Sequence, residues 1–134
     1  MKDLRGRRGF TLIEMIIVFT MIGILVGLAL PQFKNAAKKA REATLHEDLA
    51  ILRKVIDQYF SDKAKYPASL QTLVDEKYLR KIVNDPITGK PDWVEVREEP
   101  SVDDLLEPGY QAGIVDVHSS SELVGMDGTV YNTW

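Results

Sequence analysis

The segment GFTLIEMIIVFTMIGILVGLAL, residues 9–30, decides the fold of this 134-residue chain. From Phe10 to Leu30 there are 21 residues, and Glu14 is the only ionisable side chain among them. A helix needs roughly 20 apolar residues to cross a bilayer. A carboxylate in the hydrocarbon costs on the order of 2.5–3.5 kcal/mol on insertion scales, so its presence there indicates a function and a partner. The pattern therefore predicts a membrane-spanning helix whose single charge has a role.

A short basic segment precedes the apolar run. It reads MKDLRGRRG at positions 1–9 and carries four basic residues and one acid. A chance apolar helix with one acid and an ordinary secretory signal peptide are the alternative explanations. A signal peptide has an apolar core of about 7–15 residues that ends at a cleavage site. Because the run here is longer, we expect it to remain in the mature protein.

These residues resemble the type IV pilin and pseudopilin family, whose precursors share a basic leader and the motif G-F-T-L-I-E. The resemblance implies that a membrane-embedded prepilin peptidase removes residues 1–9 by cutting between Gly9 and Phe10, and then methylates Phe10. Glu14 would become the fifth mature residue and would pair with the methylated amino terminus of a neighbouring subunit. It also implies a cytoplasmic leader, with everything after Pro31 outside the bacterial inner membrane.

The helix is predicted to continue beyond the membrane, with no breaker between residues 35 and 60. Pro31 removes a backbone hydrogen bond, so we expect a kink or local melting near Gly27–Pro31. Gly23 and Gly27 either let helices approach closely in lipid or are simply tolerated there. Five apolar residues recur at intervals of four, three, four and three, which places them on one helix face: Leu45, Leu49, Leu52, Ile56 and Tyr59.

Charge clusters follow the span. The basic residues between Lys34 and Arg41 are explained by lipid headgroups, although they leave the membrane orientation open on charge alone. The resemblance implies contacts between subunits instead, in which Glu42, Glu47 and Asp48 supply the opposite sign. We expect His46, in the same region, to be an exposed helix residue.

The remainder is predicted to be a small globular region. Ser69 has the character of an N-cap, so a second helix is expected over Ser69–Leu79. Residues 93–96 and 110–117 have strand patterns, and residues 130–131 are a candidate last strand. The acidic stretch 98–107 is expected to be an exposed loop.

The predicted fold class is therefore α+β and type IV pilin-like. It has a long N-terminal helix with a membrane-spanning first half, a short second helix and a small C-terminal antiparallel sheet. We expect residues 10–33 to form the transmembrane and assembly half of the long helix, residues 34–61 its soluble half, and residues 62–134 the periplasmic globular region. Within that region Tyr66-Pro67-Ala68-Ser69-Leu70 and Asp85-Pro86 resemble the Y-P-x-x-L segment and D-P turn of the major pseudopilins of type II secretion systems.

The same resemblance implies a calcium-binding loop near the C-terminus. Calcium prefers about six to eight oxygen ligands, and the candidate ligands are Asp116, Ser119, Ser121, Glu122 and Asp127. The family's paired neighbouring aspartates are not obvious here, and a plain polar turn is the alternative. Zinc at Asp116 and His118 would have too few ligands. No cofactor is otherwise expected.

Composition narrows the class of protein. The net charge is −3, and removal of a leader of charge +3 leaves about −6, which argues against a nucleic-acid partner. Cysteine is absent, so no disulfide can stabilise the exported region. No arrangement of residues resembles a nucleophile, base and orienting group, so we expect a non-enzymatic protein.

Three functional hypotheses follow. The first is a major pseudopilin that polymerises into a periplasmic filament for protein export, and the second is a subunit of a surface type IV pilus. The third, a membrane-tethered protein that never polymerises, leaves Glu14 and the cleavage motif without a purpose. Under the first hypothesis the expected partners are further copies of the chain, the prepilin peptidase, the inner-membrane assembly platform, minor pseudopilins and, before assembly, inner-membrane lipid.

Overall fold

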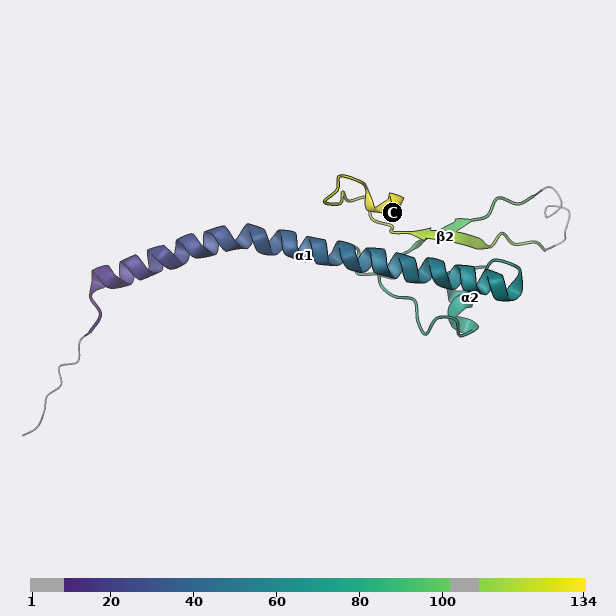
Figure 1. Cartoon of the computed structure of the whole chain (residues 1–134), viewed down its shortest axis with the longest axis horizontal. Helices are drawn as coiled ribbons and strands as arrows, with labels where there is room; N and C mark the ends of the chain where they lie inside the picture. Colours follow the sequence, from purple (N-terminus) through teal and green to yellow (C-terminus); the bar gives the residue numbers. More distant parts are fainter. Residues whose placement is uncertain (1–8, 102–108) are drawn as a thin grey trace, which may run out of the picture. The chain divides into compact units, whose positions relative to one another are not determined.

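The computed structural model describes residues 9–101 and 109–134. The chain divides into two compact units, Met1–Ala37 and Lys38–Trp134. The elements, in order, are α1 (Leu12–Lys63), α2 (Leu70–Asp75), β1 (Val94–Arg97), β2 (Ile114–His118) and the short 3-10 helix η2 (Tyr131–Thr133) (Figure 1). The predicted α+β class is confirmed. Residues 1–8 of the predicted leader and residues 102–108, which include most of the predicted acidic loop, lie outside the described residues.

The first unit contains the apolar part of α1. The helix continues through Pro31 without interruption, so the local melting predicted near Gly27–Pro31 is wrong for this structure. Proline removes the hydrogen bond to the carbonyl four positions earlier, and its ring crowds that carbonyl, which here belongs to Gly27. The loss of one hydrogen bond does not end the helix, since the backbone remains helical on both sides of Pro31.

The second unit packs around residues 38–63 of α1, which we call the stem. The five apolar residues predicted to share one face are all buried, and they form the core together with residues of α2, β2 and η2 and the residue that precedes β1. The other buried apolar residues are Leu70, Leu73, Trp93, Ile114, Val117 and Tyr131. The helical period of the sequence thus identified the packed face of the stem.

Both helices of this unit end at residues with positive φ. Ala64, with a φ of 54°, follows the last residue of α1. Lys77, with a φ of 65°, ends α2 in a Schellman arrangement, in which Tyr78 N–H donates to Leu73 O (2.8 Å) and Lys77 N–H donates to Val74 O (3.1 Å). Helix α2 therefore ends at Asp75 rather than near the predicted Leu79. Its predicted N-cap, Ser69, is confirmed, because the hydroxyl accepts from Thr72 N–H at 3.3 Å.

The sheet has two antiparallel strands, β1 and β2, with Val94 opposite His118 and a register shift between Val96 and Arg97. Strand β2 begins only after Gly113, because the chain there touches the segment that leads into α2. A Cβ on Gly113 would lie 2.3 Å from Tyr66 Cβ, and Ile114 N–H donates to Pro67 O at 2.8 Å. The predicted strand from residue 110 is therefore too long at its start.

The predicted last strand at residues 130–131 is wrong. Val130 forms only an isolated bridge with Val124, and Tyr131 begins η2. Tyr131 turns into the core, where its side chain is 2 % exposed. That inward turn interrupts any ladder and brings the end of the chain against the stem.

Candidate functional site

The start of α1 holds the residues that the cleavage motif singled out. Thr11 is its N-cap residue, since Glu14 N–H donates to Thr11 Oγ1 (3.3 Å) and Met15 N–H donates to Thr11 O (3.2 Å). Thr11 and Glu14 thus have the spacing of a capping box, a signal that the sequence reasoning missed. The carboxylate of Glu14 lies in the first turn, where the helix dipole favours a negative charge.

Gly9 and Phe10 flank the predicted cleavage site and are both exposed. A Cβ on Gly9 would meet no atom within 4 Å, so the fold of this chain does not itself require glycine there. The same is true of Gly23 and Gly27 in the apolar part of α1. A requirement for glycine at these positions would therefore come from a second molecule that packs closely against them.

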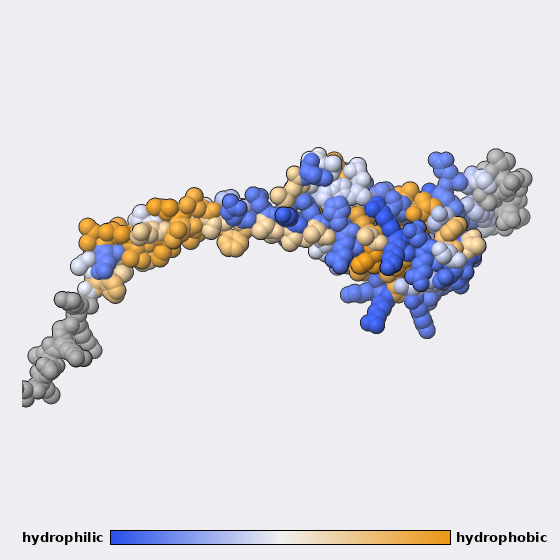
Figure 2. Space-filling model, in the orientation of Figure 1, coloured by the Kyte–Doolittle hydropathy of each residue, from blue (hydrophilic) through white to orange (hydrophobic). Residues whose placement is uncertain are grey.

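The apolar part of α1 packs against nothing in its own chain. None of its most apolar 18-residue window is buried, and Figure 2 shows apolar side chains covering the surface of this part of the helix. By length and composition, α1 is the one helix among residues 9–101 and 109–134 that could cross a membrane. Leaving a Leu, Ile or Phe side chain in water forfeits roughly 1.5–3 kcal/mol of burial free energy. This surface therefore needs lipid or other protein around it.

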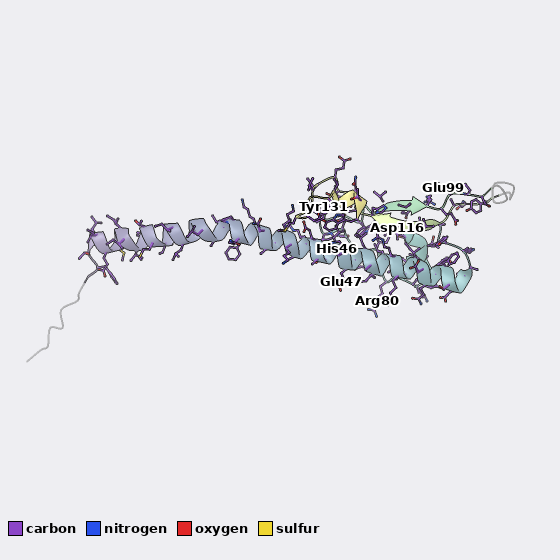
Figure 3. All side chains as sticks on the ribbon, turned by 45° about the horizontal axis from the view of Figure 1, so that its top comes forward. His46, Glu47, Arg80, Glu99, Asp116 and Tyr131 are labelled. Carbon is purple, nitrogen blue, oxygen red and sulfur yellow. The ribbon has the colours of Figure 1, made fainter. Side chains whose placement is uncertain are left out.

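A second cluster of polar contacts lies where residues 119–134, which we call the C-terminal segment, meet the stem. Four stem residues at helical spacing contact this segment: Lys38, Glu42, His46 and Arg53. We call these four residues the stem ladder. In the view of Figure 3, Tyr131 of the segment lies above α1 and Glu47, the neighbour of His46, lies below it.

Glu42 is the buried member of the stem ladder, with 9 % of its surface exposed. Its Oε1 accepts from Tyr131 O–H (2.7 Å) and from Met126 N–H (2.8 Å). Burial, followed by the hydrogen bond to Glu42, raises the pKa of Tyr131 to about 12. Glu42 thus forms its hydrogen bonds within its own subunit. From the sequence it had been grouped with Glu47 and Asp48 as an acid that contacts basic residues of neighbouring subunits.

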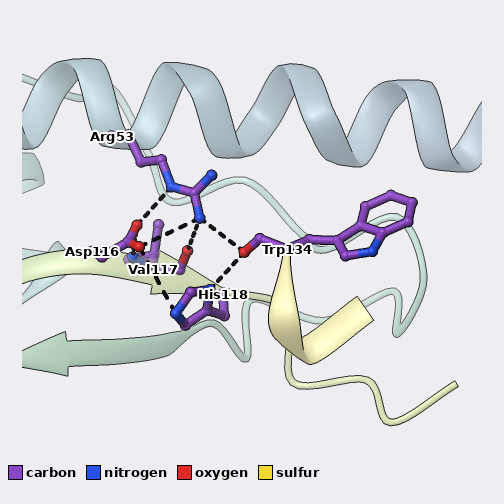
Figure 4. A network of polar contacts seen from close by, with 5 residues as sticks. All are labelled: Arg53, Asp116, Val117, His118 and Trp134. Carbon is purple, nitrogen blue, oxygen red and sulfur yellow. Dashed lines mark hydrogen bonds and ion pairs between the residues drawn. The ribbon is translucent and has the colours of Figure 1, made fainter. Parts of the chain in front are cut away.

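Arg53 joins the stem to both β2 and the C-terminal segment (Figure 4). Its guanidinium donates to Asp116 Oδ1 at 2.6 Å, to Val117 O at 3.2 Å and to Trp134 O at 2.8 Å. His118 Nδ1 lies 2.6 Å from the same Trp134 oxygen. The pair of Arg53 and Asp116 is more than a third exposed on both sides, so solvent screens much of its attraction.

His46 lies one helical turn from Glu42 and is exposed, as predicted. Its ring stacks on that of Trp134, with centroids 4.2 Å apart and planes 11° from parallel. Lys38, one turn on the other side, donates from Nζ to Val124 O at 2.8 Å. The ladder therefore contacts the C-terminal segment from Val124 to its end at Trp134.

The five candidate calcium ligands do not converge on one point. Asp116 binds Arg53, Ser119 donates to buried Asp85, and Ser121 Oγ accepts from Leu123 N–H. Two hydrogen bonds from Thr129, backbone first and hydroxyl second, lower the pKa of Asp127, and Glu122 is exposed. Among residues 9–101 and 109–134 no three His, Asp or Glu side chains lie close enough to hold a metal ion. The residues as placed do not fit a calcium site.

Comparison with known proteins bears on both ends of the chain. Residues 4–30 match the prokaryotic N-terminal methylation motif. The type II secretion system core protein G of Klebsiella pneumoniae is 30% identical over 93% of this chain and 89% of its own length. The protein of the same name from Aeromonas hydrophila is 30% identical over 92% of this chain and 86% of its own length.

The chain belongs to the type II secretion core protein G family. A fimbrial protein of Eikenella corrodens, EcpC, is also 30% identical, but over only 58% of this chain and 54% of its own. No solved structure matches the chain. The matches to the Klebsiella pneumoniae and Aeromonas hydrophila proteins thus extend over the globular region, whereas the fimbrial match covers little more than half of the chain.

The sequence reasoning missed the stem ladder. Its signal was present, because Lys38, Glu42 and His46 are spaced by four residues and border the apolar face of the stem. The pattern alone does not separate a polar stripe that faces solvent from one that binds a distant segment of the chain. Glu42 meets its donors 84 and 89 residues later, a distance over which helical periodicity carries no information.

Proposed function

We propose that this chain is a major pseudopilin, a structural subunit that polymerises through the first half of α1 into a periplasmic filament that drives protein export by a type II secretion system. The observation that carries the proposal is the exposed apolar surface of α1 with Glu14 as its single charge. A helix of this kind is stable only inside lipid or among other helices. The family relationship favours a filament of secretion subunits over a lone membrane anchor.

The cleavage and pairing chemistry follows from the motif. Hydrolysis of the Gly9–Phe10 bond would release the leader and leave a free amine on Phe10, which is then methylated. Inside the bilayer this amine and the carboxylate of Glu14 on a neighbouring copy would neutralise each other, which removes two charges that lipid disfavours. Pairing would also fix the axial offset between copies. Gly23 and Gly27 would leave room for the close approach of neighbouring helices.

The same proposal defines partners and location. Before assembly the chain would span the inner membrane once, with the leader in the cytoplasm and the second unit in the periplasm. The prepilin peptidase, the inner-membrane assembly platform and minor pseudopilins would be its protein partners. The role is structural rather than catalytic, which agrees with relatives that are named as core proteins of a secretion system.

A comparison of secreted proteins between the wild-type strain and a deletion strain tests this function. The pseudopilin proposal predicts that specific extracellular proteins are lost from the deletion strain and accumulate in the periplasm, while surface fibres remain. Complementation with the full-length gene should restore export.

The opposite outcome supports the second candidate. An unchanged set of secreted proteins, together with missing surface fibres, would make the chain a pilus subunit, the function favoured by its similarity to the fimbrial protein of Eikenella corrodens. Loss of neither exported proteins nor fibres would contradict both candidates.

A further inference from the structure

The C-terminal segment contains little regular secondary structure, and yet it is firmly connected to the stem. It contains one isolated bridge and the three residues of η2. Backbone hydrogen bonds inside the segment, such as that from Tyr131 N–H to Leu123 O at 3.0 Å, satisfy some of its polar groups, and those without a backbone partner need side chains, water or an ion.

Its central connection is to the carboxylate of Glu42. One oxygen of this buried group accepts from both Met126 N–H and Tyr131 O–H, at 2.8 and 2.7 Å. Met126 lies within the turn at Gly125–Thr129, where Gly125 N–H donates to Thr129 O at 2.7 Å, and Tyr131 follows this turn. A single carboxylate thus holds the turn and the residue that follows it against the stem, as a cation bound by several loop oxygens would hold a calcium loop.

The oxygen atoms that a cation would use are already occupied. Asp127 accepts twice from Thr129, at 2.9 Å from its N–H and at 2.7 Å from its hydroxyl. Ser119 donates to Asp85, a fully buried carboxylate that also accepts from Ile87 N–H at 2.7 Å. Asp116 is held by Arg53. A cation in this segment would have to break these bonds, and a buried group that loses its partner incurs a desolvation penalty.

We propose that the carboxylate of Glu42 anchors the C-terminal segment to the stem in place of a bound divalent cation, so that this subunit folds and keeps its C-terminal segment docked without calcium. The carboxylate accepts its hydrogen bonds from an N–H and an O–H group of the chain itself. Lys38, His46 and Arg53 extend the contact along the stem. This inference concerns the fold of one subunit and does not depend on the proposed function.

Thermal unfolding of the full-length chain in detergent micelles tests the role of calcium. The melting temperature is measured after removal of metal with excess EGTA and again after calcium is restored in excess. A ligand that binds only the folded state raises stability in proportion to the logarithm of its concentration over Kd. We expect the two melting temperatures to agree within about 1 °C. A fall of several degrees in EGTA that calcium reverses, and that Asp127→Ala abolishes, would overturn the proposal.

Substitution of the anchor tests the other half of the proposal. Glu42→Ala removes the acceptor of two buried donors and is expected to lower the melting temperature on the order of 5–15 °C. Limited proteolysis should then cut within residues 119–134 before it cuts elsewhere in the second unit. Glu47→Ala is the matched control, because Glu47 is an exposed glutamate on the same stretch of the stem. It should leave both readouts unchanged.

Two further variants keep the test decisive if Glu42→Ala fails to fold. Glu42→Gln retains an acceptor oxygen and should show a smaller loss than Glu42→Ala. Tyr131→Phe removes only one of the two donors and should loosen the segment while the core stays packed. Melting temperatures of these two variants equal to that of Glu47→Ala, with proteolysis of residues 119–134 also unchanged, would contradict the anchoring role of Glu42.

Discussion

Two glutamates on one helix, Glu14 and Glu42, differ in where their partners come from. Glu14 lies in the first turn of α1 and is exposed, and its backbone N–H donates to Thr11 Oγ1. Glu42 is buried and accepts from donors more than 80 residues away in the same chain. Around Glu14 the apolar residues are exposed, whereas around Glu42 they form the core.

The difference separates what the chain satisfies by itself from what it leaves to other molecules. A buried carboxylate requires donors, and the C-terminal segment provides them to Glu42. A carboxylate in an apolar helix also requires a partner, and for Glu14 we propose that a second copy supplies it. In the monomer, the first half of α1 therefore lacks partners for its apolar side chains and for Glu14, whereas the buried side chains of the second half have partners within the chain.

The largest expected effect is that of Glu14→Ala on filaments. Without the carboxylate, the amine of a neighbouring copy has no counter-charge in the membrane, so we expect a cleaved, inserted monomer and no filaments. Electron microscopy of sheared and pelleted material measures the loss. The melting temperature of the variant in detergent should equal that of the wild type. Normal filaments from this variant would refute charge pairing.

The next largest effect should come from a pair of leucines, one in each half of α1. Leu52 is 1 % exposed and Leu25 is 66 % exposed. Leu52→Ala should cost about 2–5 kcal/mol of the free energy of unfolding, because it leaves a cavity in the core. Leu25→Ala should leave it unchanged. Thermal unfolding of both variants in detergent, followed by circular dichroism, measures these changes. Similar losses of stability in the two would contradict the conclusion that only the second half of α1 is packed within the monomer.

Two glycines extend the comparison to the backbone. A Cβ on Gly113 would lie 2.3 Å from Tyr66 Cβ, whereas a Cβ on Gly27 would meet no atom within 4 Å. Gly113→Ala should therefore lower stability by about 1–3 kcal/mol through overpacking. Gly27→Ala should leave the monomer unaffected and disturb only assembly. Denaturant unfolding of each variant checks the first expectation, and filament yield checks the second.

The buried Tyr131 predicts a pH dependence of stability that arises in the second unit and not in the first half of α1. Its pKa is raised from about 10 in the unfolded chain to about 12 in the folded one. The stability that it contributes is therefore complete below pH 10 and is lost as the pH rises through 12. Tyr131→Phe should flatten this loss relative to the wild type when melting temperatures are recorded from pH 9 to 12. An identical decline in both proteins would place the titrating group elsewhere.

The smallest effect is expected at Asp116. Because its pair with Arg53 is more than a third exposed on both sides, Asp116→Asn should cost only about 0.2–1 kcal/mol. The loss should shrink as salt is added, since ions screen exposed charges. Denaturant unfolding at low and high ionic strength measures the change. A loss as large as that of Leu52→Ala would mean that the Arg53 network, rather than the apolar core, dominates the stability of the second unit.

Local signals of the sequence were sufficient for much of the fold. The period of Leu45, Leu49 and Leu52 identified the packed face, and Ser69 identified the start of α2, because these depend on neighbours a few residues apart. Signals that depend on backbone conformation at a single residue were missed. Lys77 adopts a positive φ, uncommon for lysine, and so ends α2 early.

The candidate sites divide in the same way. The cleavage motif, with Gly9, Phe10 and Glu14, can be identified from adjacent residues, and the match of residues 4–30 to the methylation motif agrees with it. The role of Glu42 could not be predicted, because its donors come from the other end of the chain. The proposed calcium ligands were close in sequence, but their side chains are bound to Arg53, Asp85 and other groups that a linear pattern does not reveal.

Intermolecular coupling at Glu14 tests the central claim most directly. Filaments assembled from a mixture of unlabelled and 15N-labelled chains are treated with a zero-length carbodiimide, which joins a carboxylate only to an amine in contact with it. The account predicts cross-linked peptides in which the Phe10 amine of one isotope is joined to Glu14 of the other. Intact filaments that yield only same-isotope links, or no link at Glu14, would contradict it.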